Sequence, residues 1–228
     1  FRHVLSNSNN NYCPSILFLY QNDPTVVIGR AQNPWLETNF PWIKENKINL
    51  IRRQSGGGSV YHDLGNLNYS FLALTPLYQV DQHLRILIDA LANLGLDAHA
   101  NKRHDLYINE DGTEKKISGS AFRKASDRAF HHATLLIESN LDNLITSISS
   151  NFKIDQSSAK GVKSVRSKVA NLNQLNQNIN INSIIKVIVE EYKNIHQIED
   201  STIILENQSQ IDNDIIQNSI SDLKKDKW

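Results

Sequence analysis

The sequence lacks several features that would assign a protein to a class at once. Its 228 residues include a single cysteine, Cys13, so no disulfide can form within the chain, and this agrees with a reducing compartment. Lysine and arginine together number 24, as do aspartate and glutamate, so the chain lacks the global positive field that nucleic-acid binders use. No apolar run approaches the roughly 20 residues that span a bilayer. We therefore expect neither a nucleic-acid partner nor a membrane span.

Methionine is also absent, even from position 1, which predicts a processed chain or a part of a longer protein. What is present suits a folded domain, because 39% of the residues are hydrophobic and 21% are charged. The length is sufficient for one sizeable core. We expect a single domain over residues 1–205, followed by a polar tail or linker over residues 206–228.

Short apolar runs rich in β-branched residues alternate with turn residues, a pattern typical of β-strands. Ser15–Tyr20 and Thr25–Ile28 flank an Asn-Asp-Pro sequence, which predicts two strands paired through a turn. Leucine and isoleucine recur at helical spacing over residues 84–94, with Asp81 as the expected N-cap and Gly95 just after the end. This order predicts an α+β fold with a mixed, largely antiparallel sheet and helices packed on one face. Further strands are expected at 48–53, 60–62, 67–74, 105–108, 116–118 and 133–137, with a hairpin turn at Asp111-Gly112 and a second helix at 183–192.

The densest chemical signal is the segment 52–63, which reads Arg-Arg-Gln-Ser-Gly-Gly-Gly-Ser-Val-Tyr-His-Asp. Its three glycines let the backbone approach a ligand and direct N–H groups at anionic oxygens. The planar guanidinium of Arg53 could bind a phosphate. A flexible turn with surface arginines explains the same pattern equally well. The segment is neither a Walker A loop nor a dinucleotide fingerprint, because the residues and spacings that define those motifs are missing.

Four residues or pairs later in the chain give weaker signals. Lys116 is followed by small residues and could reach into a pocket, although a solvated lysine at a hairpin edge gives the same pattern. Asp105 opens an apolar strand, where it could bind Mg²⁺, pair with a lysine or simply flank a turn. His131 and His132 suggest a metal, but neighbouring strand residues face opposite sides, so we do not expect both to bind one ion. Thr134 could hydrogen-bond a ligand.

Together and in this order, these segments resemble the lipoate–protein ligase and lipoyltransferase family, which belongs to the biotin/lipoate ligase superfamily. Each match is weak alone, but several in one order are specific, and they spread over residues 18–172. In this family a strand and helix usually precede the first matching segment, and many members have a small C-terminal accessory domain; we expect both to be missing from residues 1–228. The matching segments are residues 26–35, 53–63, 65–66, 116–123, 131–136 and 160–166.

The resemblance implies an adenylate-forming enzyme that uses ATP, Mg²⁺ and (R)-lipoate. Lipoate and ATP would give lipoyl-AMP, and a lysine of a carrier domain would then take the lipoyl group. Lys116 would bridge the carboxylate and the α-phosphate, and Asp105 would bind Mg²⁺ or orient Lys116. The loop N–H groups and Arg53 would hold the nucleotide, and the first two glycines would leave room for the dithiolane. The implied ATP and lipoyl-AMP site is Arg53, Gly56, Gly57, Gly58, Ser59, Val60, Tyr61, His62, Lys116, Ala121 and Thr134.

The implied partners are lipoyl domains of 2-oxoacid dehydrogenase E2 subunits and the glycine cleavage H protein. The resemblance also implies a monomer that is cytoplasmic in a bacterium or in the mitochondrial matrix of a eukaryote. Two alternatives stay open: a lipoyltransferase that uses preformed lipoyl-AMP, and a non-catalytic module that binds the adenylate. An octanoyltransferase with a cysteine nucleophile is disfavoured, because Cys13 lies outside every matching segment.

Overall fold

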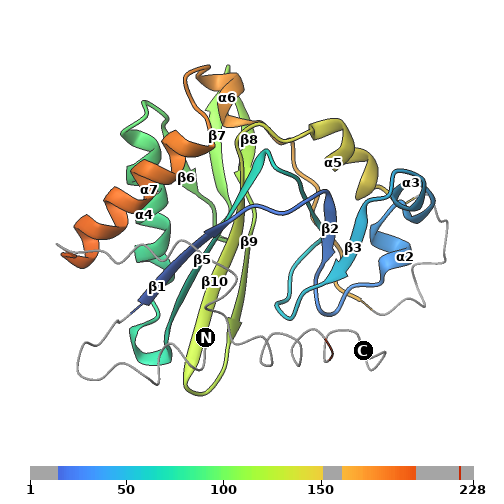
Figure 1. Cartoon of the computed structure of the whole chain (residues 1–228), viewed down its shortest axis with the longest axis horizontal. Helices are drawn as coiled ribbons and strands as arrows, with labels where there is room; N and C mark the ends of the chain where they lie inside the picture. The colour runs from blue at the N-terminus through green and yellow to red at the C-terminus, as the bar shows by residue number, and fades with distance from the viewer. Residues whose placement is uncertain (1–14, 151–160, 199–220, 222–228) are drawn as a thin grey trace.

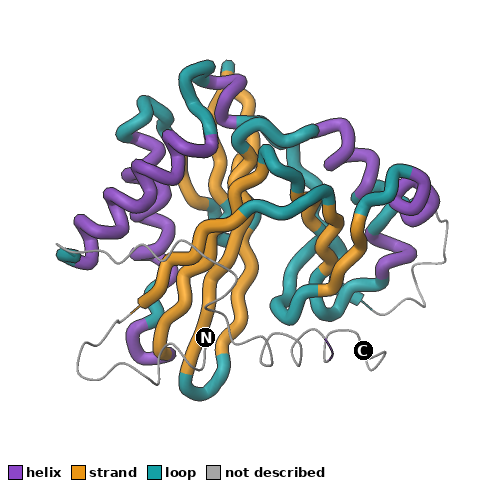
Figure 2. Tube along the Cα trace, in the orientation of Figure 1, coloured by secondary structure: helices purple, strands orange, loops and turns teal. Residues whose placement is uncertain are grey.

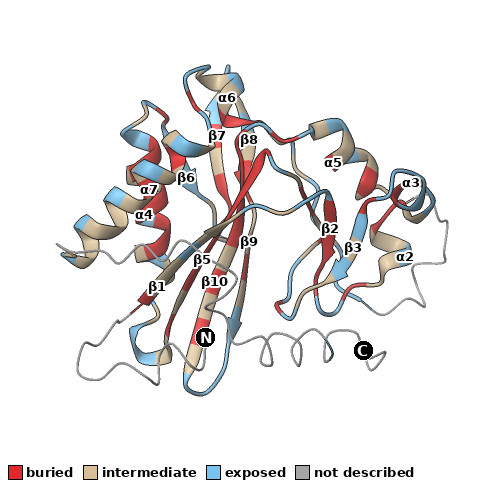
Figure 3. Cartoon of the chain, viewed as in Figure 1, coloured by how far each residue is buried: buried red, intermediate tan, exposed pale blue. Residues whose placement is uncertain are grey.

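The computed structural model describes residues 15–150, 161–198 and 221, and these residues form three β-sheets flanked by helices (Figure 1). The main sheet is antiparallel and has the strand order β1-β5-β10-β9. Its two long central strands, β5 and β10, carry much of the buried surface (Figure 3). The four strands are β1 (Ser15–Tyr20), β5 (Asn66–Leu74), β10 (Arg128–Leu136) and β9 (Ser120–Lys124).

A second antiparallel sheet consists of β6 (Ala98–Ala100), β7 (Leu106–Glu110) and β8 (Thr113–Ser118). The predicted hairpin turn between β7 and β8 is confirmed. Asp111 and Gly112 have φ values of +50° and +76°, as a two-residue turn with both central residues in the left-handed region requires.

Two amphipathic helices, α4 (Val80–Ala92) and α7 (Ile181–His196), pack against each other and close one face of the core. The predicted N-cap of the first helix is wrong. Gln79 is the N-cap residue, and Asp81 lies inside the first turn, where a carboxylate favours the helix dipole without accepting a cap hydrogen bond. Gly95, with φ +76°, follows the helix end as predicted. The buried positions of the two helices include Leu84, Leu87, Leu91, Ile184 and Ile188.

The third sheet has the order β3-β2-β4, with β2 (Thr25–Ile28) parallel to β3 (Asn49–Arg52) and antiparallel to β4 (Val60–His62). Short helices surround it at the far side of the molecule from α4 and α7 (Figure 2). All four residues of β2 are buried. These helices are α2 (Pro34–Glu37), α3 (Phe40–Glu45) and α5 (Leu141–Ser147).

The predicted pairing of β1 with β2 is wrong, although both strands form at the predicted residues. β1 pairs with β5 in the main sheet, and β2 pairs with β3 and β4 in the third sheet. β2 is buried throughout, so it needs partners on both edges, whereas β1 is an edge strand whose residues are mostly half-buried. The Asn-Asp-Pro turn therefore passes the chain from one sheet to another.

Two short elements complete the described chain, the 3-10 helix η1 (Thr75–Leu77) and the helix α6 (Leu172–Leu175). Among the described residues, none of the helices has the length and apolar character needed to cross a membrane. The expected boundary between residues 205 and 206, and all of the predicted tail except Ser221, lie outside the described residues.

Candidate active site

The glycine-rich loop (residues 53–59) connects β3 to β4 and lies against the turn that follows β2. Arg30 donates its N–H to the Ser55 carbonyl at 2.9 Å. Gly57 has φ +89°, a conformation that favours glycine, and a Cβ on Gly29 would overlap the Gly57 carbonyl oxygen. A Cβ on Gly56 would meet nothing within 4 Å. The backbone geometry therefore requires glycine at positions 29 and 57 but not at 56.

The Arg53 side chain holds this loop in place. Its Nη2 donates to the carbonyl oxygens of Gly56 and Gly58, each at 2.7 Å, and its Nη1 donates to that of Val27 at 3.1 Å. Burial lowers the pKa of Arg53 to about 10, and the nearby Tyr20 hydroxyl opposes that shift. Because these donors bind the protein's own backbone, Arg53 acts here as a brace for the loop, and its predicted contact with phosphate stays a prediction.

A strap (residues 161–170) crosses from this loop to the second sheet, and Ser164 joins it to the loop. The Ser164 hydroxyl oxygen accepts the Ser59 N–H at 2.9 Å and a Gln32 amide N–H at 3.0 Å. The amide oxygen of the buried Gln32 accepts the Gly29 N–H at 2.9 Å and the Ser59 hydroxyl at 3.0 Å. Gln32 therefore binds the β2 turn, the glycine-rich loop and the strap through one amide group.

The other end of the strap lies beside β8, bound to the backbone of Lys116. The Lys116 N–H donates to the Lys168 carbonyl at 2.8 Å, and the Ala170 N–H donates to the Lys116 carbonyl at 3.2 Å. Ser167 and Tyr107 add a hydrogen bond between their hydroxyls at 3.1 Å. Lys116 therefore anchors the strap through its backbone, which leaves its side chain for the site.

The Lys116 side chain is paired with Asp105. Its Nζ lies 2.9 Å from Asp105 Oδ2, and the side chains are 18% and 4% exposed, respectively. Ile117 is an extra residue at the bulge in β8, since Lys116 pairs with Tyr107 and Ser118 with Leu106. A bulge re-aims the neighbouring side chains and is common beside functional sites. Of the roles expected for Asp105, the structure contains the ion pair.

Two histidines line the site as neutral imidazoles. His132 Nε2 lies 2.6 Å from the Ser55 hydroxyl, and His62 Nδ1 lies 2.9 Å from the Asn22 amide nitrogen. Burial, and then the positive charge of Arg53, lowers the pKa of each histidine to about 4. His131 points to the opposite side of β10 and is fully buried, which confirms the predicted alternation. Within the described residues, no group of three or more His, Cys, Asp or Glu side chains could hold a metal.

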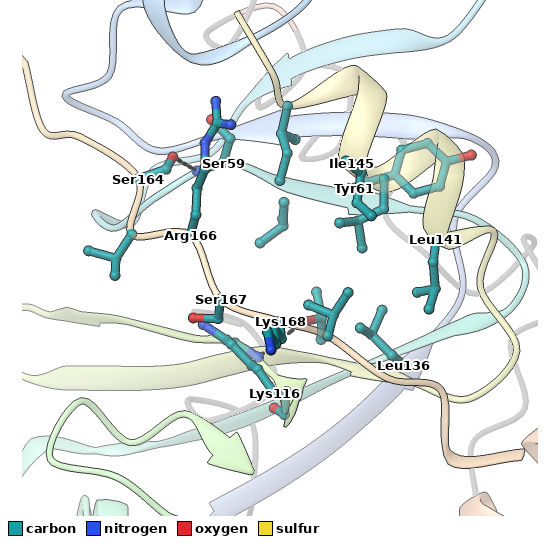
Figure 4. A pocket seen from close by; sticks show the side chains of 18 of the residues that line it. Ser59, Tyr61, Lys116, Leu136, Leu141, Ile145, Ser164, Arg166, Ser167 and Lys168 are labelled. Atoms are coloured by element: carbon teal, nitrogen blue, oxygen red, sulfur yellow. Dashed lines mark hydrogen bonds between the residues drawn. The ribbon is translucent and has the colours of Figure 1, made fainter. Parts of the chain in front are cut away.

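Two cavities meet at Lys116. The larger has a volume of about 700 Å³ and the smaller about 250 Å³. Figure 4 shows the larger cavity, with Tyr61, Leu141 and Ile145 on the side opposite Ser164 and Arg166. The smaller cavity is lined by the polar groups around Arg53 and the two neutral histidines. Both cavities share Ser59, Val60, Lys116, Gly119, Thr134, Ser164 and Val165.

The structure brings most of the predicted site residues together at these cavities. Gly56 and Gly57 are the exceptions, because they line neither cavity. Gly57 faces the Arg53 guanidinium and the Ala121 methyl group, whereas Gly56 faces open space, so the space expected for a dithiolane beside these two glycines stays a prediction. The predicted residues that line a cavity are Arg53, Gly58, Ser59, Val60, Tyr61, His62, Asp105, Lys116, Ala121 and Thr134.

Sequence reasoning missed two residues, Gln32 and Ser164, that act through their side-chain hydrogen bonds. Gln32 and Ser164 lie inside the segments 26–35 and 160–166, which carried the family resemblance, so that signal pointed to them without naming them. The apolar wall from α5 gave no signal, because its leucines and isoleucines are typical of any helix that packs on a core. The residues of this wall are Leu141, Leu144, Ile145 and Ile148.

Comparison with known proteins gives matches over most of the chain. Residues 2–193 match the family model of the lipoyl protein ligase A/B catalytic domain. Lipoate-protein ligase A of Bdellovibrio bacteriovorus is 43% identical over 181 residues, which are 79% of this chain and 53% of that protein. The chain thus spans about half the length of the curated relatives that it matches.

Solved structures agree with that match. The P. falciparum protein LipL1 in complex with lipoate is 30% identical, with a TM-score of 0.74 over 87% of this chain and 56% of that one. A lipoate-protein ligase A bound with ATP is 26% identical, with a TM-score of 0.66 over 90% of this chain and 81% of that one. The predicted α+β fold of the lipoate ligase type and the resemblance to this family are both confirmed, and the chain belongs to the lipoyl protein ligase A/B catalytic domain family.

Proposed function

We propose that this chain activates lipoate with ATP to lipoyl-AMP and transfers the lipoyl group to a lysine of a carrier domain. The observation that carries the proposal is the position of Lys116 where two cavities of different size meet. An adenylate-forming enzyme needs two adjoining subsites with a cation between them. The family match supports the proposal, as do the lipoate and the ATP in the solved structures of two relatives.

The sizes and linings of the cavities suggest which ligand each one takes. The larger cavity, about 700 Å³, suits a nucleotide, and the strap places Arg166 and Lys168 along it to meet phosphates. Its apolar wall from α5 suits a purine ring. The smaller cavity, about 250 Å³, suits the shorter acid. The imidazoles of His62 and His132 line it in the neutral form, and Arg53 and Lys116 supply positive charge in the same cavity for the carboxylate of the acid.

In the first half-reaction, a carboxylate oxygen of lipoate attacks the α-phosphorus of ATP. A new P–O bond forms, the bond to the bridging oxygen breaks, and pyrophosphate leaves with its electron pair. Two anionic groups must approach each other, so the Lys116 ammonium between them offsets their repulsion. Asp105 keeps that ammonium in place through the 2.9 Å ion pair.

In the second half-reaction, the amine of the carrier lysine attacks the carbonyl carbon of lipoyl-AMP. A C–N bond forms, the bond from that carbon to the phosphate oxygen breaks, AMP leaves, and the amine proton passes to water. We propose that the carriers are lipoyl domains of E2 subunits and the H protein. The chain's own residues act mainly by orienting the anhydride in line with the incoming amine.

Magnesium is expected with ATP, but the residues around Asp105 do not fit a resident Mg²⁺ in this arrangement. Asp105 Oδ1 accepts the Ser120 N–H at 2.9 Å, and Oδ2 faces the Lys116 ammonium. A hard cation needs several oxygen ligands that are free of such partners. The predicted role of Asp105 as a metal ligand stays a prediction, and the mechanism above includes no step at a metal.

The test is pyrophosphate release from lipoate and ATP by the purified chain, followed by transfer to an apo carrier domain. We expect release by the wild type, and none above background from Lys116→Ala, with unchanged circular dichroism as the control for folding. Transfer from synthetic lipoyl-AMP without release would instead identify a lipoyltransferase. Binding of lipoyl-AMP with neither reaction would identify a non-catalytic module.

A further inference from the structure

Ser120, at the start of β9, binds the turn before Asp105 at two points. Its backbone N–H donates to Asp105 Oδ1 at 2.9 Å, and its hydroxyl donates to the His104 carbonyl at 2.6 Å. His104 has φ +61°, a left-handed conformation that is strained for a residue with a side chain. Such a conformation persists only where the surroundings fix it. Ser120 therefore helps to fix both the carboxylate that faces Lys116 and the strained residue before it, together with Asn101, which accepts the backbone N–H groups of Asp105 at 3.0 Å and His104 at 2.9 Å.

His131, on the neighbouring strand β10, contacts Ser120 from behind the site. Its Nε2 lies 2.9 Å from the Ser120 hydroxyl oxygen. The one hydroxyl proton of Ser120 already goes to the His104 carbonyl, so His131 must be the donor in this second bond. This requires the tautomer with its proton on Nε2, and it leaves Nδ1 without a hydrogen-bond partner among the residues that the structure describes.

We propose that His131 is a positioning residue for Lys116, acting through Ser120 and Asp105. The proposal rests on the function proposed above for Lys116. Without the His131 donor, the Ser120 hydroxyl can rotate away from the His104 carbonyl. The turn that carries Asp105 then relaxes, and the Lys116 ammonium is no longer fixed between the two cavities.

The alternative is that His131 only fills the core. It is fully buried and stacks on Phe122, with ring centroids 4.6 Å apart. His83 on α4 offers a matched control in the same core cluster, because it is 2% exposed, stacks on Phe71 at 4.4 Å and lies beside His131 with ring centroids 5.7 Å apart. Burial lowers the pKa of both histidines, so both are neutral. Unlike His131, His83 is not hydrogen-bonded to Ser120, Asp105 or Lys116.

The experiment compares His131→Phe with His83→Phe and with His131→Gln, whose amide can still donate to Ser120. Lipoate-dependent pyrophosphate release gives kcat and the KM values, and thermal melting gives stability. For His131→Phe we expect kcat to fall about tenfold relative to His83→Phe, equivalent to about 1.4 kcal/mol, with KM values within about twofold. His131→Gln should recover part of the loss, because it restores the donor.

Amide hydrogen exchange at Ser120 tests the positioning without any need for activity. The Ser120 N–H should exchange faster in His131→Phe than in His83→Phe, because its bond to Asp105 loosens. Equal kcat and equal exchange in the two phenylalanine variants would overturn the proposal, as would a kcat for His131→Gln no higher than that of His131→Phe. A wild-type chain that releases no pyrophosphate would refute the proposed activation of lipoate, and the exchange rates alone would then decide the role of His131.

Discussion

Ser164→Ala should weaken ATP binding by releasing the strap from the glycine-rich loop. The substitution removes the acceptor for the Ser59 N–H and for the Gln32 amide, at 2.9 and 3.0 Å. We call the strap closed when both of these hydrogen bonds are formed, as they are in this structure. At about 0.5–1.5 kcal/mol for each hydrogen bond, their loss destabilises the closed strap relative to an open one by about 1–3 kcal/mol. If nucleotide binding requires the closed strap, the apparent affinity falls with the closed fraction. We therefore expect the KM for ATP to rise by up to about 5- to 150-fold.

Saturating ATP should restore most of the kcat of Ser164→Ala, because the substitution leaves Lys116 and Asp105 unchanged. The KM for ATP comes from pyrophosphate release at saturating lipoate, and the Kd of a non-hydrolysable ATP analogue comes from calorimetry. Ser167→Ala is the comparison, since it removes one hydrogen bond, to Tyr107, at the other end of the strap. A KM within twofold of the wild type, or an equal rise in Ser167→Ala, would refute a specific role for the contact between Ser164 and the loop.

Two further predictions concern stability. Gly57→Ala should destabilise the fold by about 1–2 kcal/mol, because φ at this residue is +89°. Gly56→Ala is the control: its Cβ would face open space, so the melting temperature should stay within about one degree of the wild type. The free energy of unfolding should fall as the pH drops from about 6.5 to about 4. The pKa of His62 and of His132 is about 4 in the folded chain but about 6.5 in the unfolded chain, so between these pH values only the unfolded state binds the extra protons. Denaturant unfolding at pH 7 and pH 5 measures this. Replacing both residues by asparagine should reduce the dependence but not remove it, because burial also lowers the pKa of His83 and His131; an unchanged slope would contradict the prediction.

The sequence predicted where strands form better than it predicted how they pair. The run Thr25–Ile28 is a strand as expected, since four β-branched residues, three of them apolar, suit a buried strand. Its partners, β3 and β4, follow only from contacts between distant residues, which local patterns do not encode. The hairpin at Asp111 and Gly112 was predictable, because both the turn and the pairing depend on neighbouring residues.

The candidate site shows the same contrast between features that neighbouring residues determine and features that depend on contacts between distant residues. Lys116 and the glycine-rich loop were predictable, because residue type and spacing within one segment carry the signal. The brace formed by Arg53 was not, since its guanidinium could bind a phosphate or its own loop with the same geometry, and only the fold decides. Ser164 is similar, because a serine gives no signal until the strap places it 2.9 Å from the Ser59 nitrogen.

The two functions of Lys116 explain why replacing it by alanine is informative. Its backbone N–H and carbonyl bind Lys168 and Ala170, so the closed strap depends on the backbone of this residue. Alanine retains both of these hydrogen bonds and removes the side chain beyond Cβ, including the ammonium beside Asp105. Loss of pyrophosphate release in Lys116→Ala with an unchanged Kd for the ATP analogue would therefore isolate the charge between the two cavities. A Kd raised as far as in Ser164→Ala would mean instead that the lysine side chain acts by closing the strap.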